Sequence, residues 1–260
     1  MTDLEIKIEN NGLAFVTLNR PEVNNAFNAS VIDLLNEAFT SLGQNKDVHV
    51  IILSGNGKNF SAGADLNWMK QAASFSEEEN VQDAIKLADM LSVINTCPKP
   101  VIGVIQGVAM GGGVGLTSVV DIAIGAPSTK FALSEVKLGL TPATISPYVV
   151  AAIGSRQARR LFLTAERFDA QAALAYGLLH DIAEDPMSEA IILAEALLNN
   201  APAAMADAKK LIADVDGQPI TAELRHLTAQ RIAARRKSDE GKEGLDAFLS
   251  KRKPNWSAPS

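Results

Sequence analysis

Two continuous apolar runs limit the possible folds of this chain more than any other feature of its sequence. The first, "VHVIILSG", begins at Val48, and the second, "VIGVI", covers residues 101–105. Runs without polar alternation are typical of strands that are covered on both faces of a sheet. The segment 76–95 between them has an acidic first turn and is followed by Pro98 and Pro100, so it indicates a helix. This strand–helix–strand order predicts a parallel sheet with right-handed connections.

The rest of the chain alternates between strands and helices at first and then becomes helical. "LEIKIE" and "AFVTLN" flank "NNG" and predict an N-terminal hairpin. Asn28 is a candidate N-cap of a helix with apolar residues at helical spacing: Val31, Leu34, Leu35, Ala38, Phe39 and Leu42. A second helix is expected to begin in the glycine-rich run "GVAMGGGVGL", before the strand "DIAIGA". After Ser146, helices are expected at 154–165, 169–178, 187–200, 202–214, 220–237 and 240–250.

The composition restricts the partners and the compartment. Apolar residues make up 47% and charged residues 21% of the 260 residues, which is ordinary for a soluble domain. The sequence shows no signal-like N-terminus and no run of about 18 apolar residues, and its one cysteine, Cys97, suits a reducing compartment. The net charge of −6 argues against a nucleic-acid partner. We therefore expect a cytoplasmic protein that binds neither membranes nor nucleic acid, although "SKRKP" at 250–254 offers local positive charge to an anionic ligand.

Each of the two buried runs is followed by a segment of small residues. "FSAGAD" covers residues 60–65, and "GVAMGGG" covers residues 107–113. In parallel sheets, ligands bind beyond the carboxyl ends of the strands. Backbone amides near a helix N-terminus, left open by glycine and alanine, can hold a developing negative charge. Two tight turns with close helix–strand packing would give the same pattern, so the spacing alone leaves both interpretations open.

Other motifs that could explain these segments are absent. A Walker loop requires Gly-Lys-Ser/Thr, which does not occur, and Ser118 or Leu116 stands where a dinucleotide-binding loop requires its last glycine. "NFSAG" has asparagine in place of the first glycine of a serine hydrolase elbow. The three histidines are scattered, and no metal-ligand spacing is present. The sequence therefore gives no support to nucleotide-, dinucleotide- or metal-dependent chemistry.

Five motifs in series resemble the enoyl-CoA hydratase/isomerase (crotonase) superfamily across essentially the whole chain. They are "NRPEVNNAFN", "FSAGADL", "GVAMGGGVGL", "FALSEVKLGLTP" and "EGLDAFLSKRKPNW". The resemblance implies an α/β fold of the ClpP/crotonase type, a spiral of β-β-α units over residues 1–195 with perpendicular sheets. Residues 196–260 would form a C-terminal helical region used in a homotrimer or a dimer of trimers. It implies an acyl-CoA thioester as substrate and no further cofactor.

The resemblance also implies a set of site residues. The backbone amides of Ala64 and Gly112 would hold the thioester oxygen, and Glu135 would be the acid/base. Many hydratases of the family have a second glutamate where this chain has Gly115. Main-chain groups of Ala62, Asp65 and Leu66 would hold the adenine, with Asn25 and Ala26 at the entrance. Trp68 and Met69 would cover the acyl chain, with a core position as the equal alternative for Trp68, and Gly111 would also contact the substrate. Phe248 and Lys251 would come from a neighbouring subunit.

Three functions remain open because Gly115 replaces that second glutamate. The first is a hydratase that works with Glu135 alone, the second a Δ3,Δ2-enoyl-CoA isomerase with Glu135 as its single base, and the third a non-catalytic acyl-CoA binder. "SEVKLGL", "ATISPYVVAAIG" and "ARRLFLTAERFDA" are similar to the 3-methylglutaconyl-CoA and isohexenylglutaconyl-CoA hydratase branch, which serves leucine and acyclic terpene breakdown. Glycine at position 115 is not unusual in that branch, so the resemblance favours the hydratase. A glutaconyl group carries a distal carboxylate, for which a cation or amides would be needed in the acyl pocket.

Overall fold

The large sheet of the fold has six strands and is mostly parallel. The computed structural model describes residues 2–257. In this part of the chain the strand order is β1 (Leu4–Ile8), β2 (Leu13–Leu18), β3 (Val50–Gly55), β4 (Val101–Ile105), β6 (Ile122–Gly125) and β9 (Asp181–Ile182). β1 and β2 form the predicted antiparallel hairpin, and every later neighbour pairs in parallel. The predicted parallel sheet is thus confirmed.

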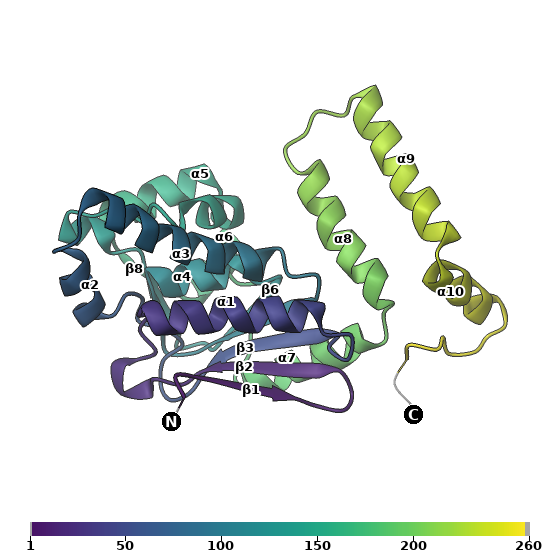
Figure 1. The fold of residues 1–260 in the computed structure, drawn as a ribbon, viewed down its shortest axis with the longest axis horizontal. Helices are drawn as coiled ribbons and strands as arrows, with labels where there is room; N and C mark the ends of the chain where they lie inside the picture. Colours follow the sequence, from purple (N-terminus) through teal and green to yellow (C-terminus); the bar gives the residue numbers. More distant parts are fainter. Residues whose placement is uncertain (1, 258–260) are drawn as a thin grey trace.

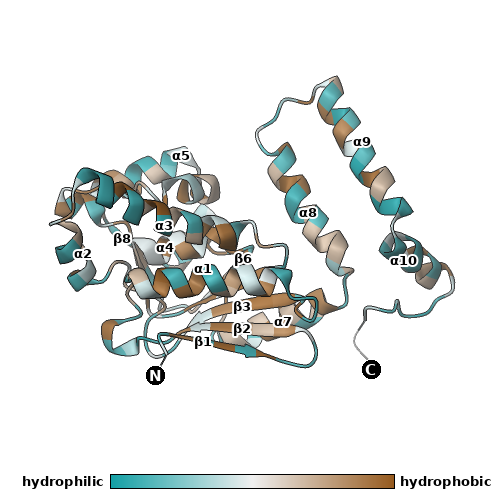
Figure 2. Ribbon diagram, in the orientation of Figure 1, coloured by the Kyte–Doolittle hydropathy of each residue, from teal (hydrophilic) through white to brown (hydrophobic). Residues whose placement is uncertain are grey.

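The apolar runs of β3 and β4 are continuous because the sheet is covered on both faces. On one face, Ile51 and Leu53 join a core that includes residues of α1 (Ala29–Gln44), α3 (Glu77–Asn95) and α4 (Gly112–Val119). On the other face, Val50 and Ile52 pack with residues of α7 (Pro186–Leu198). Figure 1 shows α1 and α3 along one side of the strands, and Figure 2 shows β3 largely in the brown of hydrophobic residues.

A second, three-stranded sheet contains segments that the sequence did not predict as strands. Its order is β5 (Val108–Met110), β7 (Lys130–Ala132) and β8 (Arg167–Asp169). Each of these strands is only three residues long, too short for a periodic pattern to register. Because β5 directly follows β4 and directly precedes α4, this small sheet fixes the position at which α4 begins.

Apart from a short helix at residues 66–72, where none was expected, the helices agree with the expected segments, with differences at their ends. Asn28 caps α1 by accepting a hydrogen bond from the Val31 amide, and Ser76 caps α3 in a capping box with Glu79. α5 (Ser146–Thr164) consists of two helical segments that meet at Gly154, whose φ of 73° and ψ of 155° are not helical. The second segment agrees with the helix expected at 154–165, and the first one precedes it. The remaining helices are α2 (Leu66–Ala72), α6 (Ala170–Tyr176), α8 (Pro202–Val215), α9 (Ala222–Lys237) and α10 (Asp239–Leu249).

The last three helices extend away from the sheets (Figure 1). The expected boundary at 195/196 falls inside α7, because Leu198 of that helix still packs on the sheet. An ion pair of 2.6 Å between Lys209 of α8 and Asp121 holds the first of these helices to the strands. Large apolar side chains remain exposed on this arm, among them Ile212, Ile220, Ile232, Leu245, Phe248 and Leu249. Within residues 2–257 no helix combines the length and apolar character that crossing a bilayer requires.

Candidate active site

A cavity of about 420 Å³ lies where the two glycine-bearing segments meet. Its walls come from the loop after β3, the N-terminus of α4, the helices α2 and α3, and the 3-10 turn Glu135–Leu138 with the residues that follow it. Both segments of small residues therefore reach one site, as expected for the carboxyl ends of neighbouring parallel strands. The volume lies in the range usual for small-molecule sites.

Close backbone packing brings Ala64 and Gly112 together at this cavity. A Cβ atom on Gly63 would lie 2.6 Å from the carbonyl oxygen of Met110 and 3.4 Å from the amide nitrogen of Gly112, so a side chain at this position is excluded. Hydrogen bonds from the Phe27 amide to the Gly63 carbonyl (2.7 Å) and from the Met110 amide to the Ser61 carbonyl (3.0 Å) hold the segment in place.

The amides of Ala64 and Gly112 are open to a ligand. Both residues line the cavity, and neither amide donates a hydrogen bond to another group among residues 2–257. Gly112 is the first residue of α4, where the amides have no partner inside the helix and the helix dipole is positive. Two such donors can stabilise an oxyanion.

Glu135 lies directly beside this helix N-terminus. A Cβ atom on Gly111 would be 2.9 Å from Oε1 of Glu135, so the absence of a side chain at Gly111 makes room for the carboxylate. Oε2 of Glu135 is buried and has no hydrogen-bond partner in the described part of the chain. Burial raises the pKa of the Glu135 carboxyl above its usual value of 4.5, and a hydrogen bond to its own backbone amide opposes that rise. A raised pKa suits a group that takes up a proton and then returns it.

Ile145 fills the place beside Gly115. A Cβ atom on Gly115 would overlap the Cγ2 methyl group of Ile145 and would lie 3.0 Å from its Cβ. Ile145 is 3% exposed, directly precedes α5 and also lines the cavity. The packing therefore leaves no room for a second carboxylate at position 115.

One wall of the cavity is apolar and comes from α2, α3 and the segment after Glu135. Its members are Trp68, Met69, Ala72, Leu87, Leu138, Leu140, Pro142 and Ala143. The indole Nε1 of Trp68 donates a hydrogen bond of 3.3 Å to Oδ1 of Asp83, which joins α2 to α3. The predicted contacts Ala62, Leu66 and Gly111 also line the cavity.

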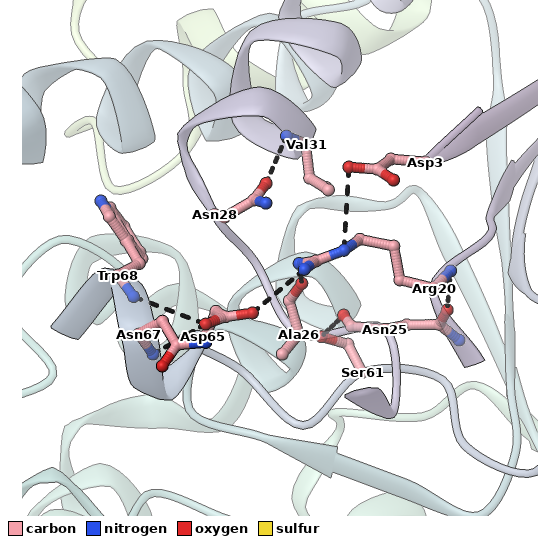
Figure 3. A network of polar contacts seen from close by, with 10 residues as sticks. All are labelled: Asp3, Arg20, Asn25, Ala26, Asn28, Val31, Ser61, Asp65, Asn67 and Trp68. Atoms are coloured by element: carbon pink, nitrogen blue, oxygen red, sulfur yellow. Dashed lines mark hydrogen bonds and ion pairs between the residues drawn. The ribbon is translucent and has the colours of Figure 1, made fainter. Parts of the chain in front are cut away.

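Asn25, Ala26 and Asp65 do not line the cavity, and the side chains of Asn25 and Asp65 have structural partners instead (Figure 3). Asn25 is 1% exposed, and its amide group donates to the carbonyls of Asn56 and Asn59. The Asn25 side chain thus has a structural role, and the place of Asn25 at the entrance stays a prediction. Asp65 caps α2 by accepting hydrogen bonds from the amides of the next turn.

The sequence analysis missed Arg20, which joins these residues (Figure 3). Its guanidinium donates to the carbonyl of Ala26 at 2.7 Å and to Oδ2 of Asp65 at 3.1 Å, and it lies 3.7 Å from a carboxylate oxygen of Asp3. Burial acts to raise the pKa of Asp65, but the hydrogen bonds from the Asn67 amide, Arg20 and the Trp68 amide hold it below its usual value. Because Asp65 follows Ala64, Arg20 fixes the loop that carries one of the two open amides.

Phe248 and Lys251 lie at the end of the C-terminal arm, which extends away from the part of the fold that holds the cavity (Figure 1). Phe248 is 79% exposed, and Lys251 is also exposed. A single chain thus does not bring them to the site, and their role stays a prediction. No group of three or more metal-ligating side chains occurs within residues 2–257.

The open amides of Ala64 and Gly112 and the buried carboxylate of Glu135 together define the class of reaction that this site can catalyse. Two open amides can hold an oxyanion, and a buried carboxylate beside them can move a proton on or off the neighbouring carbon. The sequence matches the profile described as enoyl-CoA hydratase/isomerase over residues 8–259. The chain belongs to this family.

Relatives in sequence and structure agree with this assignment. A candidate enoyl-CoA hydratase of Thermus thermophilus is 32% identical over 96% of this chain and all of its own length, and the enoyl-CoA hydratase AKT6-1 of Alternaria alternata is 38% identical over 77% of this chain and 66% of its own length. The crystal structure of an enoyl-CoA hydratase from Shewanella pealeana superposes with a TM-score of 0.96 at 44% identity, covering 98% of this chain and 96% of that one. An enoyl-CoA hydratase/isomerase from Marinobacter aquaeolei gives 0.93 at 33% identity over 99% and 100%. The predicted crotonase fold and the predicted enzyme class, a hydratase-type carbon–oxygen lyase, are confirmed at this level.

Proposed function

We propose that this protein hydrates a 2-enoyl-CoA thioester, with Glu135 as its single acid/base. The observation that carries the proposal is the contact between Glu135 and the start of α4, beside two amides that have no partner among the described residues. The hydratases among its relatives support the same reaction class.

The reaction follows from these positions. The thioester oxygen accepts hydrogen bonds from the amides of Ala64 and Gly112, each worth about 3 kcal/mol to a developing oxyanion. The Glu135 carboxylate removes a proton from water while the water oxygen bonds to the β-carbon, and the carbon–carbon π electrons move to the thioester as an enolate. The protonated Glu135 then gives its proton to the α-carbon, which restores the carboxylate and the thioester carbonyl. Water is thereby added across the double bond with no other reactant.

Further features of the proposal come from the branch resemblance. We expect a substituent on C3 of the acyl group, as in 3-methylglutaconyl-CoA, and a role in leucine or acyclic terpene breakdown. Phe248 and Lys251 would reach the CoA moiety of a neighbouring subunit in a homotrimer or a dimer of trimers. We also expect a cytoplasmic location and no cofactor beyond the CoA of the substrate.

The packing at Gly115 favours a second candidate, the Δ3,Δ2-enoyl-CoA isomerase. Isomerisation only moves a proton along the acyl chain, so one carboxylate is sufficient, whereas hydration must also position a water molecule. Because Ile145 leaves no room for a second carboxylate at position 115, the site suits a reaction that needs only one. A non-catalytic acyl-CoA binder is the third possibility, and a buried carboxylate without a partner argues against it.

One paired assay separates these functions. The purified protein is incubated with a 3-substituted 2-enoyl-CoA or with a 3-enoyl-CoA, and the absorbance of the conjugated thioester is followed. Loss of absorbance with the first substrate is expected for the hydratase. A gain with the second would instead establish the isomerase, and no change with either would leave the binder.

A substitution tests the role of Glu135. Glu135→Gln should lower kcat at least about 100-fold, while the acyl-CoA still binds, because the proton carrier is lost but the cavity keeps its shape. Glu184→Gln, at an exposed glutamate outside the cavity, is the matched control and should leave kcat unchanged. Undiminished turnover in Glu135→Gln would remove Glu135 from the mechanism.

A further inference from the structure

The charged side chains that line the cavity are both acidic. Among the described residues these are Glu135, which the proposed mechanism uses, and Asp83 of α3, which it does not. Asp83 is partly buried and forms no ion pair within residues 2–257. Its partner is the neutral Nε1–H of Trp68, so its negative charge is held in place without being neutralised.

The position of Asp83 follows from its place on α3. Leu87 lies one turn further along the helix and lines the same cavity. Leu91 lies one more turn along, and its Cδ2 is 3.8 Å from the position that a Cβ on Gly115 would take. The face that carries these three residues therefore runs from the reaction centre outward, with Asp83 about 12 Å from Leu91 at a rise of 1.5 Å per residue. Asp83 also borders an outer hollow on α3, which places it toward the rim.

The hydrogen bond to Trp68 makes Asp83 part of the acyl wall. Trp68 comes from α2 and packs against the main core, so the two helices approach each other across the apolar side of the cavity. An acyl chain held along this wall would have its distal end near a fixed negative charge. A second carboxylate at that end would be repelled, and the repulsion is stronger in a partly buried site than in water.

We propose that Asp83 selects for acyl groups whose distal end is uncharged and excludes those that carry a second carboxylate there. The inference rests on the proposed function and names its substrate class. A 3-substituted 2-enoyl-CoA whose uncharged chain reaches Asp83 fits the apolar wall, and one that ends in a carboxylate at that point does not.

Two thioesters that differ by one carboxylate test the inference. Both carry a 3-methyl-2-enoyl chain long enough to span the roughly 12 Å between Leu91 and Asp83, and one chain ends in a carboxylate where the other ends in a methyl group. We expect kcat/KM to favour the neutral compound at least about tenfold, a modest effect for like charges near a protein surface. Asp83→Asn should reduce this preference severalfold, because an asparagine oxygen can still accept from Trp68 but carries no charge.

The matched control is Asp89→Asn on the same helix. Asp89 is exposed and does not line the cavity, so this variant changes the net charge equally and should leave the preference unchanged. The inference is overturned if the unaltered protein prefers the dicarboxylic thioester, or if Asp83→Asn and Asp89→Asn give the same ratio.

Binding measurements separate this inference from the proposed reaction. The Kd values of both thioesters are measured by calorimetry on the Glu135→Gln variant, with and without Asp83→Asn. Failure to turn over either compound would refute the hydratase, whereas the ratio of the two Kd values still decides whether Asp83 discriminates between them.

Discussion

Adding a single methyl group at position 115 should test the packing that replaces the second carboxylate. In Gly115→Ala the new Cβ would overlap the Cγ2 methyl of Ile145 and lie 3.0 Å from its Cβ. Ile145 is almost fully buried among core residues, so it can move only by disturbing them or by turning into the cavity. The substitution should therefore destabilise the fold, although alanine is the better helix former.

The size of the effect is the difference between these two contributions. Overpacking of this kind costs about 2.5 kcal/mol, and replacing glycine by alanine inside a helix returns about 1 kcal/mol, so we expect a net loss of about 1.5 kcal/mol. When Ile145 is first replaced by alanine, the Cγ2 methyl is gone and only a tight contact remains. Gly115→Ala should then stabilise the Ile145→Ala protein by about 0.5 kcal/mol, which is a coupling of about 2 kcal/mol between the two sites.

Urea denaturation at a fixed protein concentration measures this double-mutant cycle. Leu198→Ala is the control, because Leu198 packs on the opposite face of the sheet and its effect should add to that of Gly115→Ala. If Gly115→Ala has the same effect in both backgrounds, Ile145 does not occupy the place of the missing glutamate and the structural account of the single carboxylate is refuted.

Two further predictions concern Glu135 and Arg20. The pKa of Glu135 is higher in the folded protein than its usual value of 4.5, so the folded state binds the proton more tightly than the unfolded state. As the pH rises from the unfolded-state pKa to the folded-state pKa, wild type should therefore lose stability relative to Glu135→Gln, by about 1.4 kcal/mol for each pH unit, and above the folded-state pKa the stability difference should be constant. Urea midpoints of both proteins from pH 4 to 8 measure this difference, and parallel curves would contradict the prediction. Arg20→Met should lower the free energy of unfolding by about 2 kcal/mol, because the charged hydrogen bond to Asp65 is lost, and Arg20→Lys should retain part of that stability. If urea denaturation shows a loss below about 0.5 kcal/mol for Arg20→Met, the network is dispensable for stability.

The sequence correctly predicted the helices and strands that short local patterns determine. The apolar stripe after Asn28 became α1 with its expected cap, and the continuous runs became β3 and β4. The glycine and alanine segments met at one cavity because parallel strands present their carboxyl ends at the same edge. The helix and the two strands are each determined by residues within a single element, and the meeting of the two loops follows from the parallel order of those strands.

The features that were missed depend on contacts between distant segments. Ile145 lies 30 residues from Gly115, and the hydrogen bond from Arg20 to Asp65 spans 45 residues. The short strands β7 and β8 pair across a similar distance and have no pattern of their own. The partners of the buried Asn25 side chain, the carbonyls of Asn56 and Asn59, are also more than 30 residues away.

The lack of room beside Gly115 and the raised pKa of Glu135 both bear on how a single carboxylate can act as acid and base. A glutamate with an ordinary pKa is a weak base toward the attacking water, and the same carboxyl must return the proton to the α-carbon. In this cavity Ile145 excludes a second charged group, and burial raises the pKa of the one that remains. The raised pKa makes the Glu135 carboxylate a stronger proton acceptor, which helps one residue to do the work of a pair. A second carboxylate placed nearby would therefore also change the pKa of Glu135, on which its proposed double role depends.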